Sequence, residues 1–129
     1  MKVDKIIALI KERVGSNYEL PGWKSHRKMS VIPINSITEK AFIPPKDAKQ
    51  ASVSIILFEE NNQLFFLLTK RTDNVEHHKG QVSLPGGAID KNETAQNASL
   101  RETNEEIGID SSTLKSLGQL SSLYTPVSY

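Results

Sequence analysis

The sequence predicts an α/β fold in which helices cover a β-sheet. Two apolar runs, residues 51–58 and 63–70, have the length and composition of β-strands. Two other segments, residues 3–14 and 95–107, carry the apolar periodicity or the end signals of α-helices. Because the apolar runs are nearly continuous rather than alternating, we expect strands covered on both faces, as in a sheet sandwiched by helices.

Length and composition favour one compact domain. The chain has 129 residues, of which 37% are hydrophobic. Its formal net charge is only +1, so the overall charge does not favour nucleic acid or an anionic membrane as a partner. The longest apolar run near the start, residues 6–10, is too short for a signal-peptide core or a membrane span, and we expect a cytoplasmic protein. The absence of cysteine excludes disulfides, thiolate metal sites and cysteine nucleophiles.

The N-terminal part is expected to be an appendage: residues 1–29 form a helix and a linker, and residues 30–129 form the main domain. Apolar residues recur at helical spacing in the first segment and predict one amphipathic helix that ends near Gly15; they are Val3, Ile6, Ile7, Ile10 and Val14. Residues 19–50 contain several prolines and are expected to be irregular.

The two apolar runs are separated by a short polar segment, residues 59–62, which predicts a β-hairpin. A further strand is expected over residues 117–124. Between them, the segment 95–107 lacks proline and glycine. Asn92 or Thr94 is a candidate N-cap, and Gly108 lies where a left-handed C-terminal cap is favoured, so these residues predict a helix.

The end of this helix is crowded with negative charge. Glu102, Glu105 and Glu106 are expected to converge on one face. Like charges at these spacings oppose helix formation, as do acidic residues near a helix C-terminus. A divalent cation such as Mg²⁺ or Mn²⁺ would compensate, because it prefers carboxylate oxygens, water and substrate phosphates. The alternative is a solvated acidic helix end.

The residues before this helix favour the metal site. Gly87 is followed after five residues by Glu93, and after seven more by "RETNEEIGI", residues 101–109. This spacing resembles the Nudix box, the signature of a family of metal-dependent hydrolases, and all of its fixed positions match. One position departs: Thr103 stands where the family usually has an aliphatic residue, and its methyl group is expected to pack in the same way.

The resemblance implies a fold, a cofactor and a reaction. The fold would be a Nudix-like α/β/α sandwich with a mixed β-sheet, incomplete at the C-terminus. The reaction would be hydrolysis of a nucleoside diphosphate linked to another group, with Mg²⁺ or Mn²⁺ as the cofactor. The resemblance implies metal ligands at Glu102, Glu105 and Glu106, a supporting ion pair of Arg101 with Glu93, and a tight turn at Gly86 and Gly87 that approaches the diphosphate. The general base lies outside the box and varies in position within the family.

A second resemblance narrows the substrate. Residues 67–87, "LLTKRTDNVEHHKGQVSLPGG", are similar to the segment that precedes the box in the coenzyme A pyrophosphatase branch. It implies cleavage of coenzyme A or its thioesters to adenosine 3′,5′-bisphosphate and 4′-phosphopantetheine, with Arg71 in contact with a phosphate. Two positions depart: Leu84 replaces a usual phenylalanine, and Glu76 stands where arginine is common.

Three hypotheses follow from these resemblances. The first is a coenzyme A diphosphatase, and the second is a Nudix hydrolase for another small nucleotide, such as ADP-ribose or a nucleoside triphosphate. The third is an inactive fragment that serves as a binding or assembly module, because the chain ends before the strands and helix that usually complete the sandwich. An incomplete sheet would also expose apolar surface and favour pairing with a second copy.

Overall fold

The structure is a computed structural model that describes residues 3–15, 19–26, 28, 43–71 and 80–125. It divides into two compact units: residues 3–48 together with 116–125, and residues 49–115. Each unit is described by itself. The boundary predicted between residues 29 and 30 lies outside the described residues.

The first unit contains two helices. Helix α1, Val3–Val14, follows the predicted amphipathic pattern and ends before Gly15. Asp4 lies in its first turn and Lys11 in its last, so both charges complement the helix dipole. The short helix α2, Trp23–His26, lies within the segment that was expected to be irregular. Neither these helices nor any other helix among the described residues has the length and apolar character needed to cross a membrane.

The strand predicted over residues 117–124 is wrong, because the structure gives these residues an irregular backbone with no strand partner among the described residues. The backbone here packs closely against the end of α1. A Cβ atom added to Gly118 would collide with Val14, and Gly118 has a φ of 152°. This close approach replaces the regular ladder that the apolar pattern suggested.

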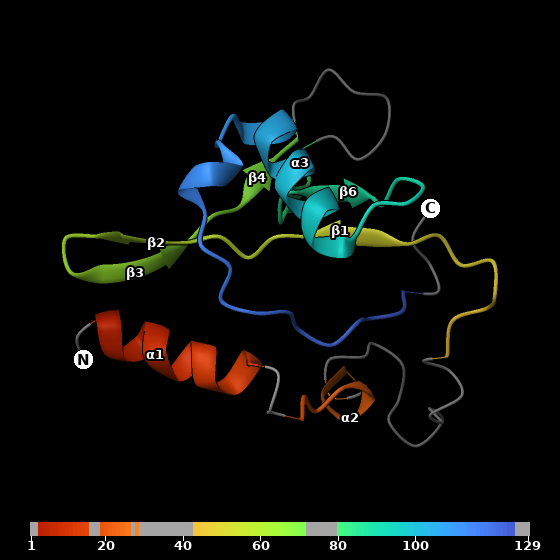
Figure 1. Cartoon of the computed structure of the whole chain (residues 1–129), viewed down its shortest axis with the longest axis horizontal. Helices are drawn as coiled ribbons and strands as arrows, with labels where there is room; N and C mark the ends of the chain where they lie inside the picture. Colours follow the sequence, from red (N-terminus) through yellow and green to blue (C-terminus); the bar gives the residue numbers. More distant parts are fainter. Residues whose placement is uncertain (1–2, 16–18, 27, 29–42, 72–79, 126–129) are drawn as a thin grey trace. The chain divides into compact units, whose positions relative to one another are not determined.

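The second unit contains three antiparallel strand pairs (Figure 1). Strand β1, Ala51–Val53, pairs with β6, Gly86–Ala88; β2, Leu57–Glu60, pairs with β3, Gln63–Phe66; and β4, Thr69–Lys70, pairs with β5, Val82–Ser83. The predicted hairpin is present as β2 and β3. Its two-residue turn, Asn61–Asn62, has positive φ angles of 51° and 64°, as a type I′ turn requires.

The two long strands predicted from the apolar runs are each divided, because they change partners along their length. After β1, the Ser54 amide still donates to the carbonyl of Pro85, at 2.8 Å. Further on, the chain turns to β3 instead, and the Leu67 amide donates to the Ile56 carbonyl at 3.0 Å. An apolar run predicts an extended segment, but it does not predict the residue at which the segment stops pairing with one strand and begins pairing with another.

Helix α3, Ala95–Ile107, packs against β1 and β6, as Figure 1 shows. Its predicted caps are present. The Thr94 hydroxyl accepts from the Asn97 amide at 3.2 Å, and Gly108 adopts the left-handed conformation with a φ of 69°. A short 3₁₀ helix, η4, follows at Ser111–Thr113. The predicted α/β class is therefore confirmed.

The coverage of the strands on both faces stays a prediction. Apolar side chains of the second unit remain 40% to 58% exposed; they are Val53, Ile55, Phe58, Phe65, Phe66, Leu68 and Val82. In the described part of residues 49–115, α3 is the one α-helix, and it covers β1 and β6. Phe58 and Phe65 stack on each other across the hairpin, with ring centroids 5.6 Å apart.

Candidate active site

The site is built from the loop between β6 and α3 and from the last three turns of α3. The loop turns at Asp90, whose carbonyl accepts from the Glu93 amide at 3.1 Å, and Asn92 adopts a positive φ of 68°. The Asp90 amide donates in return to the Glu93 carboxylate at 3.1 Å. These local bonds place the Glu93 side chain beneath α3, where it is 16% exposed.

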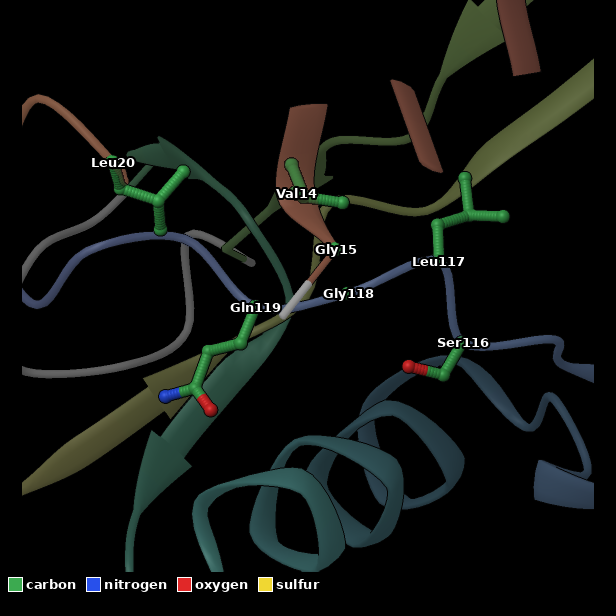
Figure 2. A pocket seen from close by; sticks show the side chains of 7 residues that line it. All are labelled: Val14, Gly15, Leu20, Ser116, Leu117, Gly118 and Gln119. Carbon is green, nitrogen blue, oxygen red and sulfur yellow. The ribbon is translucent and has the colours of Figure 1, made fainter. Parts of the chain in front are cut away.

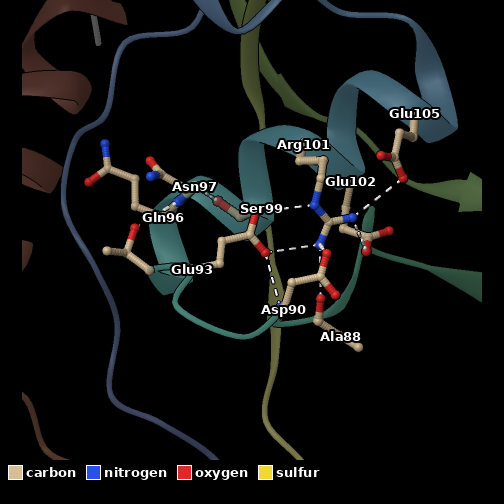
Figure 3. Close-up of polar contacts among 10 residues, drawn as sticks. Ala88, Asp90, Glu93, Gln96, Asn97, Ser99, Arg101, Glu102 and Glu105 are labelled. Carbon is tan, nitrogen blue, oxygen red and sulfur yellow. Dashed lines mark hydrogen bonds and ion pairs between the residues drawn. The ribbon is translucent and has the colours of Figure 1, made fainter.

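Arg101 joins this loop to the helix (Figure 3). Its Nε and Nη2 atoms donate to the two carboxylate oxygens of Glu93, at 3.1 Å and 3.0 Å, so the pair expected from the sequence is present as a two-pronged ion pair. Nη2 also donates to the Ala88 carbonyl at 3.0 Å. One guanidinium therefore fixes the end of β6 and the loop against α3.

The same guanidinium contacts two of the predicted metal ligands. Arg101 Nη1 donates to Glu102 at 2.8 Å and to Glu105 at 3.4 Å. Glu102 is 17% exposed, whereas Glu105 is 58% exposed and contacts Arg101 from the solvent side. The third carboxylate, Glu106, accepts from the Gly86 amide at 3.1 Å.

The three carboxylates thus belong to one helix end but have different partners. In the part of the chain that the structure describes, no three acidic or histidine side chains surround a common point as metal ligands do. The donor set still fits Mg²⁺ or Mn²⁺ chemically, because all three side chains are carboxylates. Glu102 and Glu106 lie one turn apart and both reach the Gly86–Gly87 segment, whereas the Glu105 carboxylate is exposed on the next turn of the same helix end.

Gly86 and Gly87 are expected to form a tight turn, but the structure places them in strand β6. Glycine is needed there because other groups approach closely. A Cβ atom on Gly86 would collide with the Ser52 carbonyl, and one on Gly87 would lie 2.5 Å from the Glu102 carboxylate. The backbone of β6 therefore lies directly against the acidic end of α3.

The charge pattern shifts two pKa values in this network. The Arg101 hydrogen bond lowers the pKa of the Glu93 carboxyl below its ordinary value, and the Asp90 amide lowers this pKa further. The hydrogen bonds to Glu93 and Glu102 raise the pKa of Arg101 above its ordinary value. The pair that holds the loop is therefore fully ionised at neutral pH.

Arg71 lies directly after β4, and its amide donates to the Gln81 carbonyl at 2.9 Å. It is exposed, and no hydrogen bond joins it to the Arg101 network among the described residues. Leu84 is half-buried beside the fully buried Pro85. Glu76 lies outside the described residues.

A shallow pocket of about 510 Å³ lies elsewhere, in the first unit (Figure 2). Its lining residues are Val14, Gly15, Leu20, Ser116, Leu117, Gly118 and Gln119. None of these side chains is ionisable, so this pocket lacks carboxylates and side chains for acid–base chemistry.

One part of the site was missed from the sequence: the side chain of Ser54 on the β1–β2 segment. Its hydroxyl contacts α3 through Thr103, at 3.1 Å, and through the Ser99 carbonyl, at 3.3 Å. Thr103 was the sequence feature that could have indicated this contact. A threonine at a position that usually carries an aliphatic residue has a hydroxyl that needs a hydrogen-bond partner when it is buried.

The fold and the site together define an α/β protein with an acidic helix end held against a glycine-containing strand by an arginine. Residues 48–129 match the NUDIX domain family, and the chain belongs to this family. It is 36% identical over 98 residues to Nudix hydrolase 3 of Caenorhabditis elegans, which covers 75% of this chain and 40% of that protein. It is 35% identical over 99 residues to the chloroplastic Nudix hydrolase 22 of Arabidopsis thaliana, covering 73% and 32%.

A bacterial relative is matched over a larger share of its own length. The chain is 37% identical over 78 residues to the uncharacterized Nudix hydrolase NudL of Klebsiella aerogenes, covering 60% of this chain and 64% of that protein. The chain thus spans between about one third and two thirds of the length of these curated relatives.

Proposed function

We propose that this protein hydrolyses a diphosphate linkage in a small nucleotide with the help of Mg²⁺ or Mn²⁺. One observation carries the proposal: the two-pronged pair of Arg101 with Glu93 holds the β6–α3 loop so that carboxylates of α3 meet the β6 backbone. A solvated acidic helix end needs no such arrangement. Membership of the family supports the same reaction.

Glu102, Glu105 and Glu106 would hold the cation. When bound, the cation would neutralise charge on the diphosphate and lower the pKa of a water molecule. Arg101 and Glu93 would orient the carboxylates from behind, as outer-shell partners do at other metal sites. The Gly86–Gly87 backbone would lie next to the diphosphate, because the absence of side chains lets the Glu102 carboxylate approach β6 closely. No general base is assigned.

Coenzyme A or one of its thioesters is the proposed substrate. The support is the similarity of residues 67–87 to the segment of the coenzyme A pyrophosphatase branch. The products would be adenosine 3′,5′-bisphosphate and 4′-phosphopantetheine. Arg71 would contact a phosphate, since a guanidinium binds phosphate oxygens in a fork and Arg71 is exposed at the end of β4.

A second candidate is a Nudix hydrolase for ADP-ribose or a nucleoside triphosphate. It is favoured by Glu76, which adds a negative charge where the coenzyme A branch commonly has arginine, and by Leu84 in place of phenylalanine. An inactive binding or assembly module is the third candidate. The cytoplasmic location and pairing with a second copy remain predictions.

A product assay separates these candidates. The full chain is incubated with coenzyme A, with ADP-ribose or with nucleoside triphosphates, in each case with Mg²⁺ or with a chelator, and the nucleotides are separated by chromatography. Adenosine 3′,5′-bisphosphate formed only with Mg²⁺ is the expected result. AMP from ADP-ribose without turnover of coenzyme A would support the second candidate, and no product from either substrate or from nucleoside triphosphates would support the third.

A further inference from the structure

Thr103 is the one polar residue that is buried among the described residues, and its exposed fraction is 0%. It occupies a position of the Nudix box that usually carries an aliphatic side chain. A buried hydroxyl destabilises a fold unless it is hydrogen-bonded, so its presence here calls for a partner.

Ser54 is that partner. The Thr103 hydroxyl donates to Ser54 Oγ at 3.1 Å, and the Ser54 hydroxyl donates to the Ser99 carbonyl at 3.3 Å. Ser99 lies one turn before Thr103 on α3. Ser54 Oγ therefore accepts from one turn of the helix and donates to the preceding turn.

The main chain of Ser54 is bonded to the other half of the site. Its amide donates to the carbonyl of the fully buried Pro85 at 2.8 Å. The next residue, Gly86, donates its amide to the Glu106 carboxylate at 3.1 Å. Glu106 in turn lies three residues after Thr103 on α3. Ser54 is thus linked to α3 through Thr103, and α3 is linked through Glu106 to Gly86. Gly86 is covalently joined to Pro85, whose carbonyl accepts from the Ser54 amide.

We propose that Ser54 and Thr103 are positioning residues that set the place of α3 along and around its axis relative to the Pro85–Gly87 segment. Two aliphatic side chains in contact would give a non-directional attraction that allows the helix to slide or rotate slightly. A hydrogen bond fixes a distance and an angle. The pair thereby sets how the carboxylates of Glu102 and Glu106 face the β6 backbone.

Two substitutions of Thr103 in the full chain separate positioning from packing. Thr103→Val keeps the volume and removes the hydroxyl, whereas Thr103→Ser keeps the hydroxyl and removes a methyl group. Binding of Mn²⁺ alone is titrated by electron paramagnetic resonance. This readout depends on the proposed metal site. We expect about tenfold weaker Mn²⁺ binding for Thr103→Val, as for other losses of outer-shell hydrogen bonds. Thr103→Ser is expected to bind Mn²⁺ as the parent does, although its unfolding temperature is lower.

Thr113→Val is the matched control. It removes a threonine hydroxyl that donates to the Asp110 carbonyl at 2.7 Å, in the exposed η4 turn. We expect its Mn²⁺ affinity to equal that of the parent. If Thr103→Val also binds Mn²⁺ as tightly as the parent, or if Thr103→Ser loses as much affinity as Thr103→Val, the positioning role is wrong.

A second measurement does not depend on the metal. Hydrogen exchange of the Gly86 amide, followed by nuclear magnetic resonance without added cations, reports whether Glu106 still accepts its hydrogen bond. We expect faster exchange in Thr103→Val than in the parent, Thr103→Ser or Thr113→Val. If the parent binds no Mn²⁺, the proposed function is wrong. The exchange rate of the Gly86 amide still shows in that case whether Thr103 positions α3. Unchanged exchange in Thr103→Val would overturn the inference.

Discussion

Arg101 donates hydrogen bonds to five acceptor atoms, which belong to Glu93, Glu102, Glu105 and Ala88. Only a planar guanidinium presents donors in a fixed fork that matches the two oxygens of one carboxylate. The remaining Nη1 donor is then directed toward α3. The geometry of the loop and the neutralisation of the helix end therefore depend on one side chain.

Replacing this fork by a single ammonium tests its role. Arg101→Lys keeps the positive charge, but an ammonium group has three donors on one nitrogen and cannot serve the five acceptors that surround the guanidinium. We expect a lower unfolding temperature and about tenfold weaker Mn²⁺ binding, with the far-ultraviolet circular dichroism unchanged. If Arg101→Lys bound Mn²⁺ as tightly as the parent, a positive charge at this position would be sufficient to orient the carboxylates, and the fork geometry of arginine would not be needed.

The Glu93 carboxyl gives a prediction about pH. Because the pKa of Glu93 is lowered in the folded state, its ion pair stabilises the fold above the ordinary glutamate pKa of 4.5. This stabilisation is lost as the pH falls through the lowered pKa. We expect the difference in unfolding temperature between the parent and Glu93→Gln to be constant at higher pH and to shrink in acid. A difference that does not change with pH would contradict the assignment.

At the level of residues, the sequence predicted the contacts that lie within one spaced motif. The pair of Arg101 with Glu93 follows from the box, because both residues belong to one loop and the helix that follows it. Ser54 could not be found in this way. It lies more than forty positions away along the chain, and only the pairing of β1 with β6 brings it to α3.

Two glycines contact helix α3 for different reasons: Gly108 caps its C-terminus, and Gly87 lies in β6 against the Glu102 side chain. Their substitutions are expected to have different effects. Gly108 needs a left-handed backbone, and a Cβ atom would meet no other atom within 4 Å. Gly108→Ala is therefore expected to lower the free energy of unfolding by about 1 kcal/mol and leave Mn²⁺ binding unchanged. A Cβ atom on Gly87 would instead lie 2.5 Å from the Glu102 carboxylate. Gly87→Ala is expected to weaken Mn²⁺ binding as well.

Chemical denaturation and Mn²⁺ titration of both variants check this contrast. Parent-like Mn²⁺ binding by Gly87→Ala would show that the close contact of Gly87 with Glu102 is not needed for the metal site. Parent-like stability of Gly108→Ala would show that the left-handed backbone at this position does not require glycine.

At the level of elements, helices were predicted better than strands. Thr94 and Gly108 mark the ends of α3 through local hydrogen bonds, so their signals can be read from neighbouring residues. The limits of β1 to β4 depend on partners distant in the chain, and the two apolar runs do not reveal where those partners change. The prediction of a strand over residues 117–124 was wrong for the same reason, because an apolar run does not reveal whether a partner strand lies beside it.

For the whole molecule, the NUDIX family match covers residues 48–129, and every contact of the candidate site lies within residues 49–115. Since the chain spans 40% and 32% of the two eukaryotic relatives, its activity has to be measured on this chain itself. We propose that carboxylates of α3 hold a cation that is required for diphosphate hydrolysis.

The most direct test compares Mg²⁺-dependent hydrolysis by the parent, Glu105→Gln and the control Glu60→Gln. Glu105→Gln keeps the shape of the side chain and removes its charge, while Glu60 is an exposed residue at the end of β2. Coenzyme A is the substrate, and circular dichroism verifies folding. We expect the parent and Glu60→Gln to form adenosine 3′,5′-bisphosphate only with Mg²⁺, and Glu105→Gln to fall to the metal-free background. Equal turnover by Glu105→Gln and the parent would contradict the claim.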